Sequence, residues 1–181
     1  MKYLEKLTLR ILTILLLFLI YDYIYLIALP ITTNLSFIFL KLFQYSPALL
    51  SNTISIGTTN FNFIQACVAL PAYYLLLILI LTTKDLDSKK SVKLFIIGSI
   101  LILAMNILRI DLLIAAFVSL GKEWFDTIHL VFWKFVSGVY VALVWIFLSK
   151  KYKIRSIPIY TDIKYLYNKS FLKNRSEKQS N

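Results

Sequence analysis

Residues 92–120 read VKLFIIGSILILAMNILRIDLLIAAFVSL, a long apolar run whose main polar interruptions beyond Lys93 are Asn106, Arg109 and Asp111. A transmembrane helix needs about 20 residues at a rise of roughly 1.5 Å per residue. The run is therefore long enough to cross a bilayer once and too short to cross it twice. It predicts a single transmembrane helix.

Three further stretches are apolar enough to span a membrane: residues 9–29, 66–83 and 128–149. The chain has 181 residues, of which 59% are hydrophobic and 16% are charged. One soluble core of this size cannot hide so much apolar surface, so these runs require lipid. We therefore predict an all-α integral membrane protein, a polytopic helical bundle with about four to five transmembrane helices.

Whether the protein has a fifth transmembrane helix depends on residues 33–50. The segment is apolar but carries Lys41, Gln44 and Pro47, and it is compatible with a short span, a re-entrant segment or a helix lying in the membrane interface. The interfacial helix is favoured because it keeps all the basic loops on one side of the membrane. The next residues, 51–65, are rich in Asn, Thr and β-branched side chains and predict a short extended or hairpin-like outer loop.

Basic residues set the expected orientation. Lys and Arg gather before the first span, in residues 84–93 and after the last span, and the positive-inside rule places these segments in the cytoplasm. We expect a multi-pass plasma-membrane protein with both termini cytoplasmic, a transmembrane domain over residues 1–150 and a basic cytoplasmic tail over residues 151–181. Anchoring beside anionic lipid explains the net charge of +11, so membrane lipid is an expected partner and nucleic acid is not.

Three residues from different spans share one predicted depth. Counted from the basic residues that end each span on the cytoplasmic side, Cys67 lies 17 residues away, Arg109 16 and His129 21. At the helical rise these separations are about 25, 24 and 31 Å, close to the outer edge of a hydrocarbon core about 30 Å thick. Each residue also has an ordinary interpretation. Cys67 would be a small hydrophobic residue, Arg109 would contact lipid head groups, and His129 would be a polar residue at the membrane interface. An ionisable residue inside such an apolar run, however, indicates a functional site.

Cys, His and Arg together are suited to acyl transfer through a thioester. The thiolate of Cys67 would attack a peptide carbonyl, His129 would accept and donate protons, and Arg109 would donate hydrogen bonds to the oxyanion. The expected helix N-terminus just after Cys67 favours the thiolate. Asn106, three residues before Arg109 on the same helix face, is a candidate supporting residue. Asp111 falls on another face, as a salt-bridge partner or an outer-surface charge.

These residues and their order resemble the exosortase/archaeosortase family. The resemblance rests on Gln65-Ala66-Cys67, then Asn106-Ile107-Leu108-Arg109-Ile110, then His129 at the start of the last predicted span, and it covers about residues 60–150. In length the chain is similar to the compact archaeal branch. The family commonly has a small polar residue and a Gly after the Cys, whereas this chain has Val68 and Ala69.

The resemblance implies a cysteine transpeptidase or protease embedded in the membrane, with its active site facing outward. Its substrates would be exported proteins that end in a short motif, a transmembrane helix and a basic tail. The catalytic residues would be Cys67, Arg109 and His129, and the acyl acceptor would be water, an amine or a lipid group.

Other classes of function have less support. One Cys and one His cannot fill a zinc site without carboxylates, and neither a His-x-x-x-His nor a Cys-x-x-Cys spacing occurs, so no metal or cofactor is expected. The alternative to an enzyme is a non-enzymatic polytopic membrane protein, such as a small transporter or an assembly subunit. Arg109 and Asp22 would then be buried polar contacts between helices, and Cys67 would be incidental.

Overall fold

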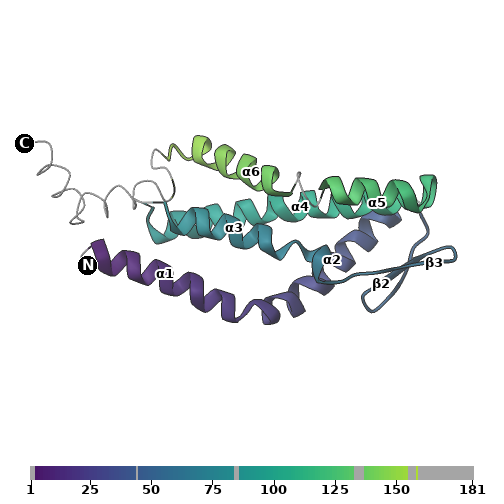
Figure 1. The fold of residues 1–181 in the computed structure, drawn as a ribbon, viewed down its shortest axis with the longest axis horizontal. Helices are drawn as coiled ribbons and strands as arrows, with labels where there is room; N and C mark the ends of the chain where they lie inside the picture. Colours follow the sequence, from purple (N-terminus) through teal and green to yellow (C-terminus); the bar gives the residue numbers. More distant parts are fainter. Residues whose placement is uncertain (1–2, 44, 84–85, 133–136, 155–157, 159–181) are drawn as a thin grey trace, which may run out of the picture.

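The computed structural model describes residues 3–43, 45–83, 86–132, 137–154 and 158. They form an elongated, mostly helical structure (Figure 1). The helices are α1 (Tyr3–Leu19), α2 (Tyr21–Leu42), α3 (Leu70–Leu81), α4 (Ser88–Leu120), α5 (Lys122–Val131) and α6 (Ser137–Lys151). Between α2 and α3 lie strands β1 (Ala48–Leu50), β2 (Thr53–Ile56) and β3 (Thr59–Asn62) and the 3-10 turn η1 (Gln65–Val68).

The first two helices follow one another with a break at a single residue. The backbone of Ile20 leaves the helical conformation, at φ −96° and ψ 12°, and separates α1 from α2. The boundaries predicted for the first span, residues 9–29, are therefore wrong, because that span crosses the break. The hydropathy of the run does not change at Ile20, so hydropathy alone could not locate it.

The interfacial helix predicted over residues 33–50 does not exist as a separate element. Its first part continues α2, and its last three residues form β1. Pro30 lies inside α2 without ending it. The hydroxyl groups of Thr32 and Thr33 donate to carbonyls one turn earlier, so these polar residues are satisfied within the helix.

The predicted outer loop is a three-stranded antiparallel sheet in the order β1-β2-β3. Its central strand pairs Thr53 with both Leu50 and Asn62. A two-residue turn joins β2 to β3, and Gly57 in this turn has a φ of 59°, which costs glycine little. Ile54 is fully buried beneath the sheet. The hairpin-like character predicted for residues 51–65 is thus confirmed, and the sheet begins earlier than predicted.

The predicted helix over residues 92–120 is confirmed as α4. It begins slightly earlier, where the side chain of Asp87 accepts a hydrogen bond from the N–H of Lys90 at 3.1 Å. Its 33 residues correspond to about 50 Å at the helical rise, well beyond a hydrocarbon core of roughly 30 Å. The helix therefore has length for both a membrane span and an extension that carries part of the site.

Close packing joins α4 to α3 and α6 near Gly98. A Cβ at this position would lie 2.5 Å from Leu76 of α3 and 3.2 Å from Leu148 of α6, and both leucine side chains are fully buried. The absence of a side chain at Gly98 is what lets the three helices approach. This contact belongs to a hydrophobic cluster shared by α3, the first half of α4 and α6.

Helix α5 folds back along α4. Gly121 separates the two helices with a φ of 89°, and the rings of Phe117 and Phe125 meet edge to face with their centroids 5.7 Å apart. The first residues of the span predicted over residues 128–149 belong to α5, and its last residues belong to α6, which begins at Ser137. Residues 133–136 between them lie outside the described residues.

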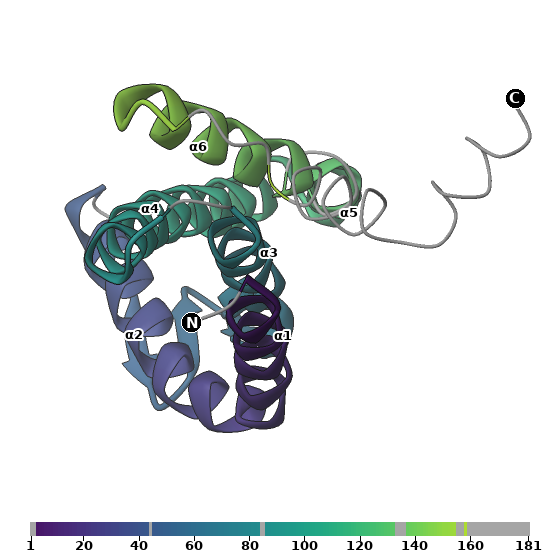
Figure 2. The same cartoon turned by 90° about the vertical axis from the view of Figure 1, so that its left-hand side faces the viewer.

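A second hydrophobic cluster holds the other end of the molecule. It joins α2, the sheet, η1 and the second half of α4, and Cys67 packs at its edge. Viewed along the long axis, α1, α2, α3 and α4 form a ring, and α6 lies outside it on the α4 side (Figure 2). The site described below lies where the two clusters meet.

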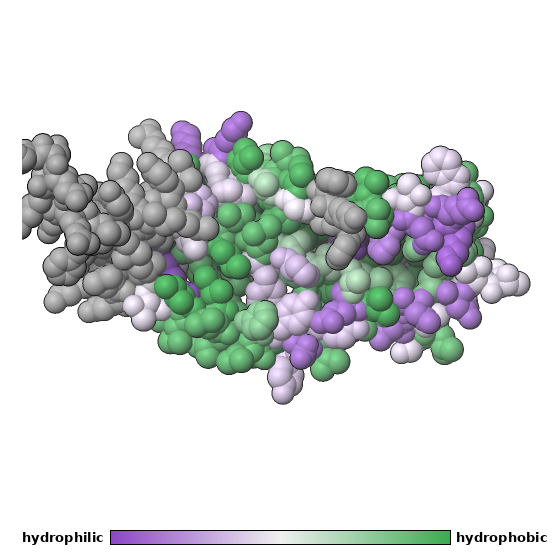
Figure 3. Space-filling model, viewed as in Figure 1, coloured by the Kyte–Doolittle hydropathy of each residue, from purple (hydrophilic) through white to green (hydrophobic). Residues whose placement is uncertain are grey.

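The outer surface is largely apolar over part of the molecule. In Figure 3 hydrophobic residues cover the region of α1, while hydrophilic residues gather toward the end that holds the sheet and α5. Helices α2 and α4 are long and apolar enough to cross a membrane, and Thr8–Leu19 and α3 are shorter apolar helices. Most of the predicted tail, residues 151–181, lies outside the described residues.

Candidate functional site

Cys67 lies in the turn η1, immediately before α3. Its backbone N–H donates to the carbonyl of Ile64 at 2.9 Å, and its side chain is partly exposed. Pro71 occupies the first turn of α3, as predicted, although the helix begins at Leu70 and not at residue 66. The thiol is thus held on a short structured turn at the N-terminal end of an apolar helix.

Ala69 gives this turn its shape. It adopts the left-handed conformation, with φ 54° and ψ 32°, between η1 and α3. This conformation costs an L-residue with a Cβ roughly 1–2 kcal/mol, and glycine avoids the cost. The position is the second after the Cys, where the family commonly has Gly. The observed backbone at Ala69 is one that glycine would adopt readily.

We expect substitutions at Ala69 to separate according to their tolerance of positive φ. Ala69→Gly should keep the turn and leave the thermal midpoint within about 3 °C, because relief of strain offsets the added chain entropy. Ala69→Val should destabilise the protein by about 1–3 kcal/mol, because β-branched residues rarely adopt this conformation. Thermal unfolding of the purified protein in detergent measures both.

The matched control for added volume is Ala142→Val, because Ala142 is exposed on α6. Equal destabilisation by Ala69→Val and Ala142→Val would contradict a role for the left-handed backbone.

Two side chains of α4 hold the Cys67 turn through its backbone. The Asn106 side chain donates its amide N–H to the carbonyl of Cys67 at 2.7 Å, and a terminal nitrogen of Arg109 donates to the carbonyl of Ala66 at 3.4 Å. Asn106 is 4% exposed and Arg109 8% exposed. The structure therefore brings Cys67, Asn106 and Arg109 together.

Part of the hydrogen-bonding capacity of these two residues is unused. Within the described part of the chain, Oδ1 of Asn106 and Nε of Arg109 are buried without a partner. Both residues line a cavity of about 30 Å³, which Phe132, just after α5, and Tyr140 of α6 also line. This volume is roughly that of one water molecule. An unpaired buried donor at this cavity is available to an oxygen atom of a bound molecule.

The structure places His129 on α5, apart from this cluster. Its ring is exposed and packs against Phe125 with a centroid distance of 5.6 Å, and no hydrogen bond to Cys67 is present among the described residues. Phe132, three residues later on the chain, lines the small cavity with Arg109. His129 is therefore about one helical turn from the edge of the site, and a substrate placed between α5 and η1 would have to bridge the two.

Asp111 is a buried residue of the contact between α2 and α4. Its carboxylate accepts a hydrogen bond from the hydroxyl of Ser36, which is fully buried. Asp111 is 4% exposed, so the expectation of an outer-surface charge is wrong. The sequence gives no sign that Ser36 is its partner, because the two residues are 75 positions apart. The pair holds α2 against the part of α4 that carries Arg109.

Two further predictions concern polar residues elsewhere. Asp22 lies exposed in the first turn of α2, so it is not the buried contact considered for a non-enzymatic protein. Among the residues that the structure describes, no group of three His, Cys, Asp or Glu side chains is placed to hold a metal ion.

Comparison with known proteins gives one match. The model of a protein family described as transmembrane exosortase (Exosortase_EpsH) matches residues 2–149. The match runs from the start of α1 into α6 and includes the η1 turn, α4 and α5. No curated protein and no solved structure matches the chain.

Proposed function

Because the chain belongs to the transmembrane exosortase family, we propose that it is a membrane-embedded cysteine transpeptidase or protease with Cys67 as its nucleophile. Its substrates are exported proteins that carry a C-terminal sorting signal of a short motif, a transmembrane helix and a basic tail. The acyl acceptor is water, an amine or a lipid group.

One observation carries this proposal. Asn106 and Arg109, one turn apart on α4, both donate to the backbone of the turn that presents Cys67. These bonds fix the sulfur relative to the guanidinium even though 42 positions separate the two residues in the sequence. Acyl transfer gains several kcal/mol when a nucleophile and a preorganised donor are held in this way.

The proposed reaction has two steps. In the first, the Cys67 thiolate forms a bond to the substrate carbonyl carbon, and the carbonyl oxygen becomes an oxyanion that Arg109 stabilises. The tetrahedral intermediate then collapses and expels the amine of the C-terminal peptide, which takes a proton from His129. This leaves a thioester on Cys67. In the second, the acceptor gives its proton to His129 and attacks the thioester carbon, and the Cys67 thiolate leaves. Arg109 stabilises the second oxyanion as it does the first.

The proposed orientation places the Cys67 turn at the outer face of the plasma membrane, with both termini in the cytoplasm. The basic ends of α4 and α6 lie together, because Nζ of Lys90 donates to the carbonyl of Tyr152 at 3.1 Å and Nζ of Lys93 lies 5.4 Å from the centre of the Tyr152 ring. A common basic end is what the positive-inside rule requires of a cytoplasmic face.

The proposed function is tested by trapping the thioester. A tagged secreted reporter with a candidate sorting signal is expressed with the full chain, and samples are quenched in acid. We expect a covalent adduct of reporter and protein that neutral hydroxylamine releases and that maps to Cys67 by mass spectrometry. The proposal would be rejected if an equal amount of adduct formed with Cys67→Ala. It would also be rejected if no adduct formed with any candidate sorting signal encoded in the same genome.

The proposed orientation predicts the behaviour of the single thiol in intact cells. Cys67 is partly exposed and is the chain's only cysteine, so a membrane-impermeant maleimide added outside should label it without any background from other thiols. Labelling only after the membrane is permeabilised would place the site on the cytoplasmic side. Denatured protein serves as the control for full reactivity.

A non-enzymatic role is the second candidate, and one contact favours it. The bond from Arg109 to the carbonyl of Ala66 uses the guanidinium to stabilise the fold, as a structural buried polar contact would. On this reading Arg109 would do no more than hold η1 against α4.

A further inference from the structure

A larger cavity lies between α1, α2, α3 and α4, beside the ring axis seen in Figure 2. Its volume is about 390 Å³, and most of the side chains around it are apolar. One end is at Leu70, three residues after Cys67, and the other is at Leu77 and Phe95. Leu77 lies about 10 Å beyond Leu70 at the helical rise. The cavity therefore extends from beneath the Cys67 turn toward the middle of the apolar region.

Helix α1 closes one side of this cavity and is itself surrounded by apolar surface. The hydroxyl of Tyr74 donates to the carbonyl of Leu17 at 2.6 Å and ties α1 to α3 beside the cavity. On either side of Leu17, Leu16 and Phe18 are exposed. In a bilayer such side chains contact acyl chains, so the lipid phase lies directly beyond this wall.

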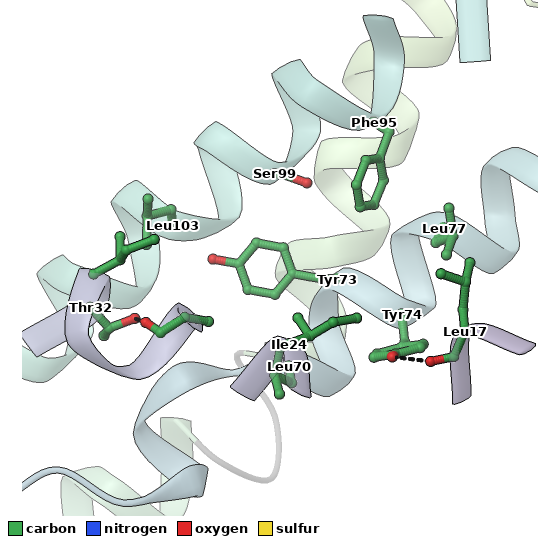
Figure 4. A pocket seen from close by; sticks show the side chains of 12 residues that line it. Leu17, Ile24, Thr32, Leu70, Tyr73, Tyr74, Leu77, Phe95, Ser99 and Leu103 are labelled. Atoms are coloured by element: carbon green, nitrogen blue, oxygen red, sulfur yellow. Dashed lines mark hydrogen bonds between the residues drawn. The ribbon is translucent and has the colours of Figure 1, made fainter. Parts of the chain in front are cut away.

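Two hydroxyl groups point into the cavity without requiring a polar ligand. Tyr73 projects from α3 toward Ser99 and Leu103 of α4 (Figure 4). The Ser99 hydroxyl is buried and has no partner among the described residues. A serine in a helix can turn its hydroxyl to a carbonyl one turn earlier, so an apolar occupant leaves this group satisfiable.

The volume of the cavity limits which apolar molecule can occupy it. A spanning helix with its side chains is 10–12 Å across and about 30 Å long, so it is far too large for this cavity. A methylene group takes about as much space as a water molecule in the liquid, roughly 30 Å³, so the cavity accommodates about a dozen methylenes in line. That is the size of most of one lipid chain.

We infer that this cavity is a binding site for one hydrocarbon chain of a membrane lipid. The chain lies between α1 and α4, with its outer end beneath the Cys67 turn. The apolar lining favours a lipid chain because an empty cavity loses packing contacts, and an equally apolar hydrocarbon chain from the bilayer restores them. The inference depends on the cavity and on the membrane location, and it is independent of any chemistry at Cys67.

The test uses the full chain in the Cys67→Ala background, so that its result cannot depend on catalysis. The protein is reconstituted in phospholipid nanodiscs that contain a trace of phosphatidylcholine with a diazirine near the end of one 16-carbon chain. After illumination, adducts are mapped by mass spectrometry. We expect adducts on Tyr73, Leu77 or Leu103, which line the cavity, in addition to those on outward-facing residues.

Two matched variants decide the result. Ala28→Phe adds a ring inside the cavity, and Ala104→Phe adds the same ring on the exposed side of α4. Cavity adducts should fall at least tenfold in Ala28→Phe and change less than twofold in Ala104→Phe. If Ala28→Phe unfolds, as judged by its thermal midpoint, Leu103→Trp replaces it. Adducts confined to outward-facing residues, or cavity adducts that persist in the filled variant, would overturn the inference.

Discussion

Cys67→Ala should abolish substrate processing, with a loss of at least about 10³-fold in the rate of reporter cleavage. Removing the nucleophile of an acyl-transfer enzyme leaves only the contribution of binding and of the oxyanion donors. Cys67→Ser should retain at most a trace of activity, because a hydroxyl is far less ionised than a thiol near neutral pH. The measurement is the ratio of cleaved to uncleaved reporter over time at equal protein abundance.

This substitution tests the thiol cleanly because the turn is held through its backbone. The bonds from Asn106 and Arg109 end on the carbonyls of Cys67 and Ala66, and an alanine at position 67 keeps both. The thermal midpoint of Cys67→Ala should therefore stay within about 3 °C of the parent protein. Full processing by a well-folded Cys67→Ala protein would remove the enzymatic proposal.

The sequence predicts a common depth for three residues, and the structure brings two of them, Cys67 and Arg109, close together. The prediction requires only the helical rise and the basic residues at the expected cytoplasmic ends, and it places Cys67, Arg109 and His129 in one plane. A common depth, however, fixes position along the membrane normal and says nothing about position within the plane. Cys67 and Arg109 meet because α3 and α4 pack together, whereas His129 lies on α5, where its described contact is with Phe125.

Helix boundaries were the less predictable part of the fold. Hydropathy identified the apolar runs, but it cannot detect the break at Ile20, since the break does not change the apolar character of the run. The bond between Ser36 and Asp111 was equally hidden, because it depends on how α2 crosses α4. Local signals succeeded where the conformation is local, as in the turn at Gly57 between β2 and β3.

Arg109→Lys should lower processing by about 10²–10³-fold while leaving the protein folded. Lysine keeps the positive charge but lacks the planar fork, so it cannot hold the carbonyl of Ala66 and present a second donor to an oxyanion together. Loss of one oxyanion donor costs an acyl-transfer enzyme about this factor. The measurement is reporter cleavage under single-turnover conditions, with thermal unfolding recorded on the same samples.

Asn106→Leu is the matched control, because it removes the other bond to the Cys67 turn and leaves the guanidinium in place. It leaves the buried carbonyl of Cys67 against an apolar side chain without a hydrogen bond, which lowers the free energy of unfolding by about 1–3 kcal/mol. A purely structural Arg109 would make the two variants alike, with activity following the thermal midpoint in both. An Arg109 that stabilises the oxyanion makes them differ: Arg109→Lys loses more activity and less stability than Asn106→Leu. Activity of Arg109→Lys within threefold of the parent would instead leave the guanidinium only the structural role of holding η1 against α4.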